Sequence, residues 1–267
     1  MVQPRTLQIQ AEKLNCAAPA PRDTVVPDFL MDDIHPQSRT LTVRLGFYKV
    51  GRMQFISHLD LQRFMKRAFV RSGLPIWFSE GFNPHPKMVF STPLSIGIQS
   101  LCEFADTKMT SPVTPAQILD ALNPCMPDEL QLFYAAPPKM KMTDIGFARY
   151  EMHLHHPAVT KETGAAVAAA LDEMYSAPLI LSKRSKSGDK DTDISPFIRK
   201  TETVFDRETG NLHIRATLCA DNANFLNPEY LIRAAAEKGL VFDDPMTAWY
   251  DIVRTEILCA DGTTPFC

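Results

Sequence analysis

Two successive runs of strand and helix patterns, in the same order, limit what this 267-residue chain can fold into. From Leu41 the apolar residues alternate as in a strand; a helical pattern, a series of strand-like stretches, a second helical pattern and a last strand follow. The order β-α-β-β-α-β then returns in the second half, without residue-level similarity between the halves. This is the order of the split βαβ, or ferredoxin-like, unit. The sequence therefore predicts an α+β protein of two tandem ferredoxin-like domains, residues 41–142 and 143–267.

The expected helices are recognised by their ends. Ser57 followed by Asp60 resembles a capping box, and Gly73 is a natural stop for the helix that Ser57 opens. Thr114 is the expected cap of the second helix, and Asn227 that of the last one. Helices are expected at 57–72, 115–123, 161–176 and 227–239, and strands at 41–50, 75–80, 86–92, 94–109, 130–138, 148–156, 179–184, 201–219 (a hairpin) and 251–260.

Composition excludes several classes of protein. Residues 1–40 are proline-rich with little periodic pattern, so we expect a poorly ordered leader there. No apolar stretch approaches the ~18 residues of a membrane helix, and no signal peptide is apparent. Six scattered cysteines form no CxxC or CxxxCxxC group, and no phosphate-binding glycine motif is present. We therefore expect a cytoplasmic protein with no membrane contact, no metal and no cofactor of its own.

The first expected helix has one apolar and one basic side. Leu61, Phe64, Met65, Ala68 and Phe69 fall on one side at about 100° per residue. The other side carries Arg63, Lys66, Arg67 and Arg71, and no acidic residue is expected to relieve their repulsion. The basic side is either a solvated surface or a phosphate-binding stripe, which Lys49, Arg52 and Lys87 could widen.

The segment Phe78–Lys87 (FSEGFNPHPK) combines groups that suit single-stranded RNA. Phe82 offers stacking, Asn83 an amide, His85 proton exchange and Lys87 a positive charge. A packed structural loop with Phe82 in the core explains the same residues equally well. A second basic stretch, residues 183–190, is expected to be either a mobile loop or, as the favoured interpretation, a solvated hairpin connection.

Histidines raise the question of catalysis. Ser57, His58 and Asp60 invite a triad interpretation, but Ser57 and Asp60 are better explained as helix-cap residues. His58 or His85 could still act as acid or base in RNA cleavage, which would make the chain an RNA-processing enzyme. The strand histidines at 153, 155 and 156 lack a further ligand, so we expect no metal site.

Several motifs together resemble a known family. Arg52–Leu61 (RMQFISHLDL), Gly73–Pro75 (GLP), Ser79–Lys87 (SEGFNPHPK) and Pro93–Ile98 (PLSIGI) resemble the radical SAM-linked protein family. This uncharacterised bacterial family is fused to, or paired with, B12-binding-type radical SAM proteins. The resemblance extends over about residues 41–258, with further matching stretches at 193–196 and 227–229. It departs from the family pattern at Ser195, where the pattern has arginine.

The resemblance implies an accessory role for this chain. It would help a separate radical SAM protein recognise its target, and it cannot be that enzyme because the CxxxCxxC motif is absent. With the basic helix, we predict a non-catalytic module that binds RNA, such as tRNA or rRNA, for modification. The alternative is a docking module for the radical SAM partner that binds no RNA. The predicted RNA- or partner-binding residues are Arg52, Ser57, His58, Arg63, Arg67, Arg71, Phe82, Asn83, His85 and Lys87.

Overall fold

The computed structural model describes residues 40–185, 188–221 and 223–267, which form two compact α+β units. Unit 1 holds the described residues up to Met142 together with Pro265–Cys267, and unit 2 is Thr143–Thr264. Residues 1–39 of the predicted leader lie outside the described residues. The helices and the antiparallel strands confirm the predicted α+β class.

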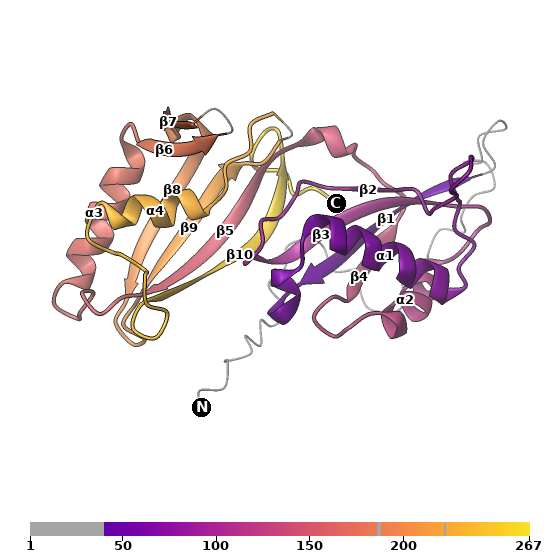
Figure 1. Ribbon diagram of the computed structural model, residues 1–267, viewed down its shortest axis with the longest axis horizontal. Coiled ribbons are helices and arrows are strands. Elements are labelled where there is room, and N and C mark those ends of the chain that lie inside the picture. The colour runs from indigo at the N-terminus through magenta and orange to yellow at the C-terminus, as the bar shows by residue number, and fades with distance from the viewer. Residues whose placement is uncertain (1–39, 186–187, 222) are drawn as a thin grey trace. The chain divides into compact units, whose positions relative to one another are not determined.

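Unit 1 has the strand and helix order that the sequence predicts (Figure 1). In its sheet β1 pairs with β4 on one side and with β3 on the other, β2 pairs with β3, and all pairs are antiparallel. Its elements are β1 (Leu41–Lys49), η3 (Gly51–Phe55), α1 (His58–Ser72), β2 (Met88–Phe90), β3 (Gln99–Met109), α2 (Pro115–Leu122), η4 (Asn123–Cys125) and β4 (Leu132–Ala136), and η5 (Met142–Asp144) follows at the unit boundary.

The prediction of a strand at 75–80 was wrong. Residues 75–80 make only isolated bridges, Ile76 with Met109 and Phe78 with Pro86. Prolines explain the difference, because Pro75 and Pro86 have no N–H to donate to a ladder. The segment instead runs beside the end of β3 and is joined to it by individual hydrogen bonds, including one of 2.8 Å from the Trp77 N–H to Lys108 O.

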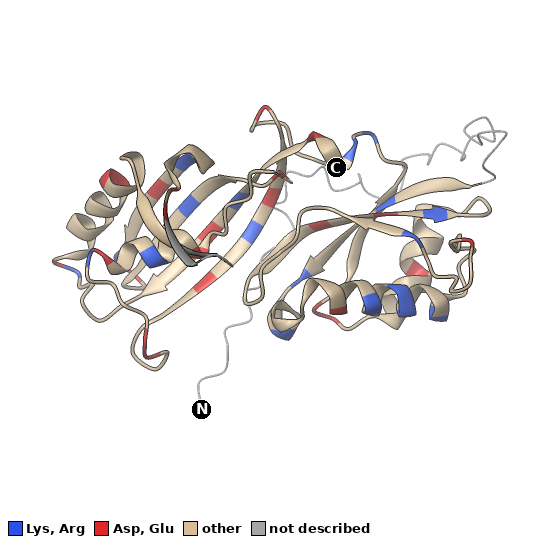
Figure 2. Cartoon of the chain, turned by 45° about the horizontal axis from the view of Figure 1, so that its top comes forward, with Lys and Arg blue, Asp and Glu red and all other residues tan. Residues whose placement is uncertain are grey.

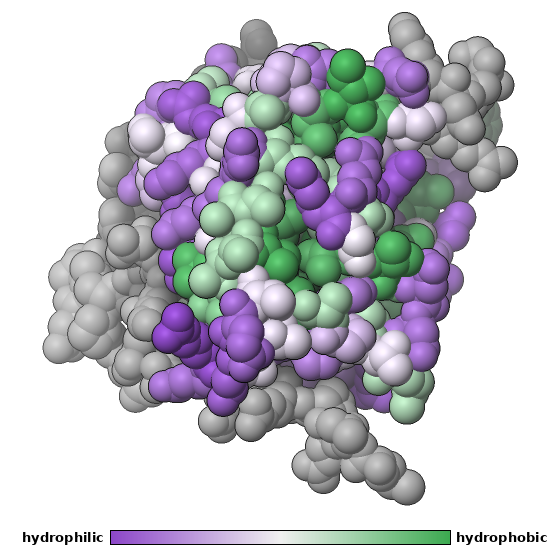
Figure 3. Space-filling view, turned by 90° about the vertical axis from the view of Figure 1, so that its left-hand side faces the viewer, coloured by the Kyte–Doolittle hydropathy of each residue, from purple (hydrophilic) through white to green (hydrophobic). Residues whose placement is uncertain are grey.

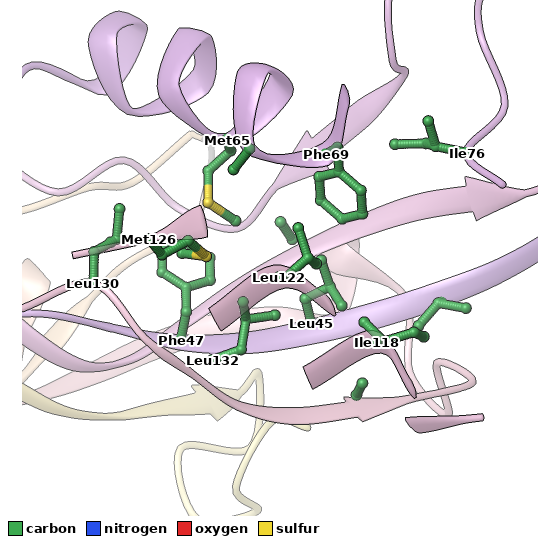
Figure 4. Packing of buried hydrophobic residues seen from close by; sticks show 14 of the residues in the cluster. Leu45, Phe47, Met65, Phe69, Ile76, Ile118, Leu122, Met126, Leu130 and Leu132 are labelled. Carbon is green, nitrogen blue, oxygen red and sulfur yellow. The ribbon is translucent and has the colours of Figure 1, made fainter. Parts of the chain in front are cut away.

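The core of unit 1 lies between its sheet and its two helices (Figure 4). The predicted apolar side of α1 is confirmed: Leu61, Met65, Ala68 and Phe69 are buried. They pack in one cluster with alternate residues of β1, such as Leu45 and Phe47, and with α2. Burying side chains of this size stabilises the fold by roughly 1.5–3 kcal/mol each.

Both helix starts in unit 1 are capped as predicted. Ser57 accepts a hydrogen bond from the Asp60 N–H of 3.1 Å, and Gly73 ends α1 in the left-handed conformation at φ 71°. Thr114 and Gln117 form a complete capping box at the start of α2.

The opposite face of β1 carries a buried arginine that the sequence did not predict. Arg44 is 0% exposed and makes a two-pronged ion pair with Asp106, at 2.8 and 2.9 Å. Its guanidinium also donates to the carbonyls of Met140 and Cys267, at 2.8 and 3.0 Å, and lies 4.4 Å from the centre of the Phe266 ring. These contacts fasten the last residues of the chain to unit 1.

Unit 2 repeats the pairing pattern of unit 1 and adds a hairpin. Its sheet runs β10-β5-β9-β8 with antiparallel neighbours, and β6 pairs with β7 in a separate two-stranded ladder. The elements are β5 (Ile145–His155), α3 (Gly164–Ser176), β6 (Ile180–Ser185), β7 (Gly188–Asp193), η6 (Ser195–Phe197), β8 (Ile198–Asp206), β9 (Asn211–Cys219), α4 (Glu229–Ala236) and β10 (Trp249–Cys259).

Two local predictions in unit 2 need correction. The stretch 183–190 forms part of the β6–β7 hairpin, except for residues 186–187, which lie outside the described residues; the mobile-loop alternative was wrong, and more of the stretch is in the ladder than a hairpin connection alone. At α4 the N-cap position is Pro228, one residue later than predicted, although Asn227 Oδ1 still accepts from the Glu229 N–H (3.2 Å) at the start of the helix.

One face of the unit 2 sheet packs against helices. The even-numbered residues of β5, from Ala148 to Leu154, are buried, and the Tyr175 hydroxyl of α3 donates to Leu231 O of α4 (2.8 Å). The outer side of α3 is rich in exposed alanine, and Figure 3, which looks onto this end of unit 2, shows apolar patches among hydrophilic ones. The odd-numbered residues of β5 from Phe147 to His155 lie on the other face and are only half-buried.

We expect Phe266→Ala to destabilise unit 1 although Phe266 follows unit 2 in sequence. Phe266 is fully buried and contacts Phe104 at 5.5 Å between ring centres, so its truncation should cost about 3–5 kcal/mol. Urea denaturation should show the loss, and hydrogen exchange should place it in β1 and β3. Phe82→Ala, at a fully exposed ring, is the control and should change stability by less than about 0.5 kcal/mol. Unchanged stability of Phe266→Ala would refute the assignment.

Candidate functional site

The outer side of α1 presents a cationic surface. Arg63, Arg67 and Arg71 are exposed and Lys66 is half-exposed, and these four residues are called the α1 basic face (Figure 2). Asp60 forms an ion pair with Arg63 at 3.0 Å, so the expectation that no acidic residue relieves this face was wrong. Within the described part of the chain, Arg67 and Arg71 have no ion pair or hydrogen bond from their side chains.

The flanking cations that could widen this surface differ in exposure and in their partners. Lys49 is 1% exposed, and its ammonium donates to Gln54 O (3.2 Å), so it cannot extend a surface patch. Its position near the end of β1, on the same side as Phe47, explains this burial. Arg52 is well exposed and pairs with Glu129 at 3.2 Å, whereas Lys87 is exposed.

The loop after α1 holds an aromatic ring in solvent. Phe82 is fully exposed, so the alternative that placed it in the core was wrong. The loop is closed beneath it by Ser79, whose N–H donates to His85 O (2.9 Å) and whose hydroxyl accepts from the His85 N–H (3.2 Å). The imidazole of His85 lies 3.1 Å from Asn83 O. The loop therefore has internal bonds that hold its shape while Phe82 projects.

His58 occupies a half-buried corner at the start of α1. Its Nε2 lies 2.8 Å from the Gln62 amide, and its ring meets the Phe90 ring edge-on at 5.5 Å. Burial lowers the pKa of His58, the Glu103 carboxylate opposes this shift and the Lys49 ammonium adds to it. A neutral imidazole is therefore favoured at pH 7.

The histidines do not share a site in the manner of a catalytic pair. Ser57 donates to Asp60 (2.7 Å) as part of the cap, and His58 bonds to Gln62. His85 is engaged by Ser79 and Asn83 in the loop. His58 and His85 thus have separate partners.

Sequence reasoning missed an apolar group beside the start of α1. Phe55, Leu59 and Ile96 are 64%, 61% and 55% exposed, and we call them the apolar corner. The Gly97 N–H donates to Gln54 O (3.0 Å), which brings the loop of Ile96 beside the segment of Phe55. Leu59 was the available signal, because it lies outside the apolar stripe of an amphipathic helix.

The histidines at 153, 155 and 156, in β5 and just after it, each have a non-metal partner. His153 Nδ1 lies 3.2 Å from Asp251, and the ring of His155 stacks on Trp249. His156 Nε2 lies 3.2 Å from Val241 O. The described residues contain no group of three or more potential metal ligands. No described helix is long and apolar enough to span a membrane.

Ser195, where the resembled family has arginine, closes the base of the β6–β7 hairpin. Its N–H and hydroxyl both donate to Asp193 Oδ1, at 3.0 and 2.6 Å. Asp193 also accepts from the Leu179 N–H (3.3 Å). A serine at this position therefore serves local structure.

We expect Asp251→Asn to lower the pKa of His153. The hydrogen bond that His153 donates to the Asp251 carboxylate raises that pKa, and a neutral amide would stabilise the imidazolium less. Because the folded-state value is raised, the pair stabilises the fold below the ordinary histidine pKa and loses this contribution as pH rises through the raised value. NMR titration of His153 measures the shift, with Asp243→Asn as the control at an exposed acid. An unchanged His153 titration in Asp251→Asn would contradict the pairing.

Comparison with curated proteins finds no match. A family of uncharacterised proteins conserved in bacteria (DUF2344) matches residues 42–228, which include α1, the Phe82 loop and most of unit 2. Its description states no activity. Because the match covers well over half of the sequence, the chain belongs to this uncharacterised bacterial DUF2344 family.

Proposed function

We propose that unit 1 binds single-stranded RNA, with the α1 basic face on phosphates and Phe82 stacked on a base. The observation that carries the proposal is the fully exposed Phe82 ring on a loop held by its own hydrogen bonds. An aromatic ring is normally buried, because burying it stabilises a fold. Stacking on a nucleobase would recover that free energy, at about 1–3 kcal/mol per base.

The charges on α1 favour an anionic ligand for the same surface. Arg67 and Arg71 are one helical turn apart, where like charges repel by about 0.2–0.5 kcal/mol. Phosphate groups bound beside both would turn that repulsion into attraction and release counterions. The loop begins only a few residues after Arg71, so the cations and Phe82 belong to consecutive segments.

The resemblance to radical SAM-linked proteins suggests the biological setting. We propose that the chain is a non-catalytic accessory protein of a separate radical SAM protein and presents tRNA or rRNA to it in the cytoplasm. This proposal is supported by the position of the motifs. Residues 52–98, which carry the resemblance, also contain the α1 basic face, the Phe82 loop and the apolar corner.

We further propose that units 1 and 2 are two ferredoxin-like domains. The support is the pairing order β4-β1-β3 with β2 beside β3 in unit 1, and β10-β5-β9-β8 in unit 2, each with two helices in the matching chain positions. The β6–β7 hairpin is then an insertion in the second domain. Fold likeness of this kind suggests RNA binding only by analogy.

A second candidate function is docking on the radical SAM protein, for which no RNA is required. The apolar corner favours it, because three large exposed apolar side chains close together mark an interaction surface. Both functions can coexist, because the apolar corner lies at the start of α1 and Arg71 at its end. An RNA-processing activity of His58 or His85 has less support, because the two histidines have separate partners. Unchanged RNA-cleaving activity of a His58→Ala, His85→Ala double variant would exclude a catalytic role for these histidines.

The RNA proposal predicts a salt-dependent loss of affinity in Arg67→Gln, Arg71→Gln. For single strands, each phosphate contact contributes about −0.7 to the slope of log affinity against log salt concentration. The slope measured for the double variant should therefore be shallower by about 1.4. Phe82→Ala should weaken binding by about 1–3 kcal/mol. Filter binding to RNA recovered by crosslinking in cells gives both values. Arg207→Gln, an exposed arginine of unit 2, is the control. The absence of salt-sensitive RNA binding in the wild type would refute the proposal.

The docking function predicts a complex that survives nuclease treatment. Leu59→Glu should weaken co-purification with the radical SAM protein about ten-fold or more, because it places a charge within the apolar corner. Val70→Glu is the matched control: it is 58% exposed on the same helix but lies three turns away. Equal co-purification of both variants would count against the apolar corner as the docking surface.

A further inference from the structure

A second candidate site lies on unit 2, independent of the RNA proposal. A cavity of about 210 Å³ is lined by Glu202, Val204 and Asp206 of β8 and by His213 and Arg215 of β9. The two strands are in register here, with Val204 opposite His213 and Glu202 opposite Arg215. Their intervening residues, such as Ile214, are buried on the helix-covered side, so the cavity opens on the other face of the sheet.

His213, which lines the cavity, has a buried nitrogen that lacks a hydrogen bond. His213 Nε2 is buried, has no hydrogen-bond partner among the described residues and lies 3.8 Å from Asp206 Oδ2, too far for a hydrogen bond. Leaving such a group unpaired is unfavourable. Burial and the nearby His153, with ring centres 4.5 Å apart, lower the pKa of His213, so its ring is neutral at pH 7 and offers an acceptor nitrogen.

The charges around that nitrogen are mainly negative. Glu202 and Asp206 contribute two carboxylates to the wall. The single cation, Arg215, is drawn toward Glu151, with Nε 3.6 Å from Oε1, so its charge is partly offset outside the cavity. Val204, 47% exposed between the two acids, supplies an apolar surface.

We propose that this cavity binds an organic cation, an ammonium or guanidinium group on a short apolar stem. The N–H groups of the cation would donate to Glu202 and to Asp206 Oδ2 beside the neutral His213 ring, and the stem would lie against Val204. The volume is below the ~300 Å³ at which drug-sized pockets begin, so it suits a head group and not a large ligand. A metal ion is not the proposed occupant, since the described residues contain no group of three or more potential ligands.

The experiment is calorimetric titration of the full chain with agmatine and with 1,4-diaminobutane as probes. We expect saturable binding of one equivalent. Glu202→Gln keeps the shape of the wall but removes a charged acceptor, so it should weaken binding about ten-fold or more. Glu208→Gln, an exposed acid in the adjoining β8–β9 turn, is the matched control and should bind as the wild type does. Asp206 is unsuitable for substitution, because it accepts from Thr209 Oγ1 (2.7 Å) and the Glu208 N–H (2.8 Å) to form that turn.

Two further measurements report on the cavity itself. Val204→Lys should abolish probe binding by placing a side-chain ammonium in the cavity. Lowering the pH from about 7.5 to about 5.5 should weaken binding, because protonated His213 becomes a positively charged donor. The groups that set this titration are His153, Asp206, Glu151 and Arg215, and Asp251 acts through its bond to His153.

A third probe, a capped Gly-Arg-Gly peptide, distinguishes a cation on a protein side chain from a free amine. Tighter binding of the peptide than of agmatine indicates a basic side chain of a protein partner, and the reverse indicates a free amine metabolite. The proposal is overturned if no probe binds saturably at millimolar concentration, or if Glu202→Gln binds like Glu208→Gln. RNA binding through Arg67 and Arg71 is unaffected by either result, so failure here is distinguishable from failure of the RNA proposal.

Discussion

The packing of α1 on β1 determines which side chains of unit 1 reach solvent. Met65 and Phe69 enter the same apolar cluster as Leu45 and Phe47, and this contact fixes the rotation of the helix about its axis. Because residues two positions after each buried one point away from the sheet, Arg67 and Arg71 must be exposed. The cationic surface is thus a consequence of core packing and needs no contacts of its own to be held in place. The caps at Ser57 and Gly73 set the length of this surface by fixing both ends of the helix.

The other face of the same strand is held by electrostatics. Arg44 is buried in a setting where an unpaired charge would cost several kcal/mol, and Asp106 with two carbonyl oxygens compensates it. One of these carbonyls belongs to Cys267, and Phe266 covers the guanidinium. Unit 1 is therefore completed by residues that the chain reaches only after unit 2. A contact of such sequence separation is slow to form, so complete packing of unit 1 should come late in folding.

Local signals made much of this structure predictable. Caps act within one turn, and the apolar periodicity of α1 and β1 needs only the geometry of each element, so α1, α2 and the β8–β9 hairpin could be derived from sequence. Contacts between distant segments could not. The burial of Lys49 depends on where the chain turns after β1, and the bond from Gly97 to Gln54 assembles the apolar corner from two segments. Asp60 was recognised as a cap residue, but its second role as the partner of Arg63 was overlooked.

The two candidate surfaces have opposite electrostatic character. The net charge of −3 describes neither, because it sums a cationic helix face in unit 1 with an acidic cavity in unit 2. Exposed charges act over about 8 Å at physiological salt, so a ligand responds to the surface it touches and not to the total. An RNA strand would be attracted by Arg67 and Arg71 but repelled by Glu202 and Asp206. The two surfaces therefore favour ligands of opposite charge.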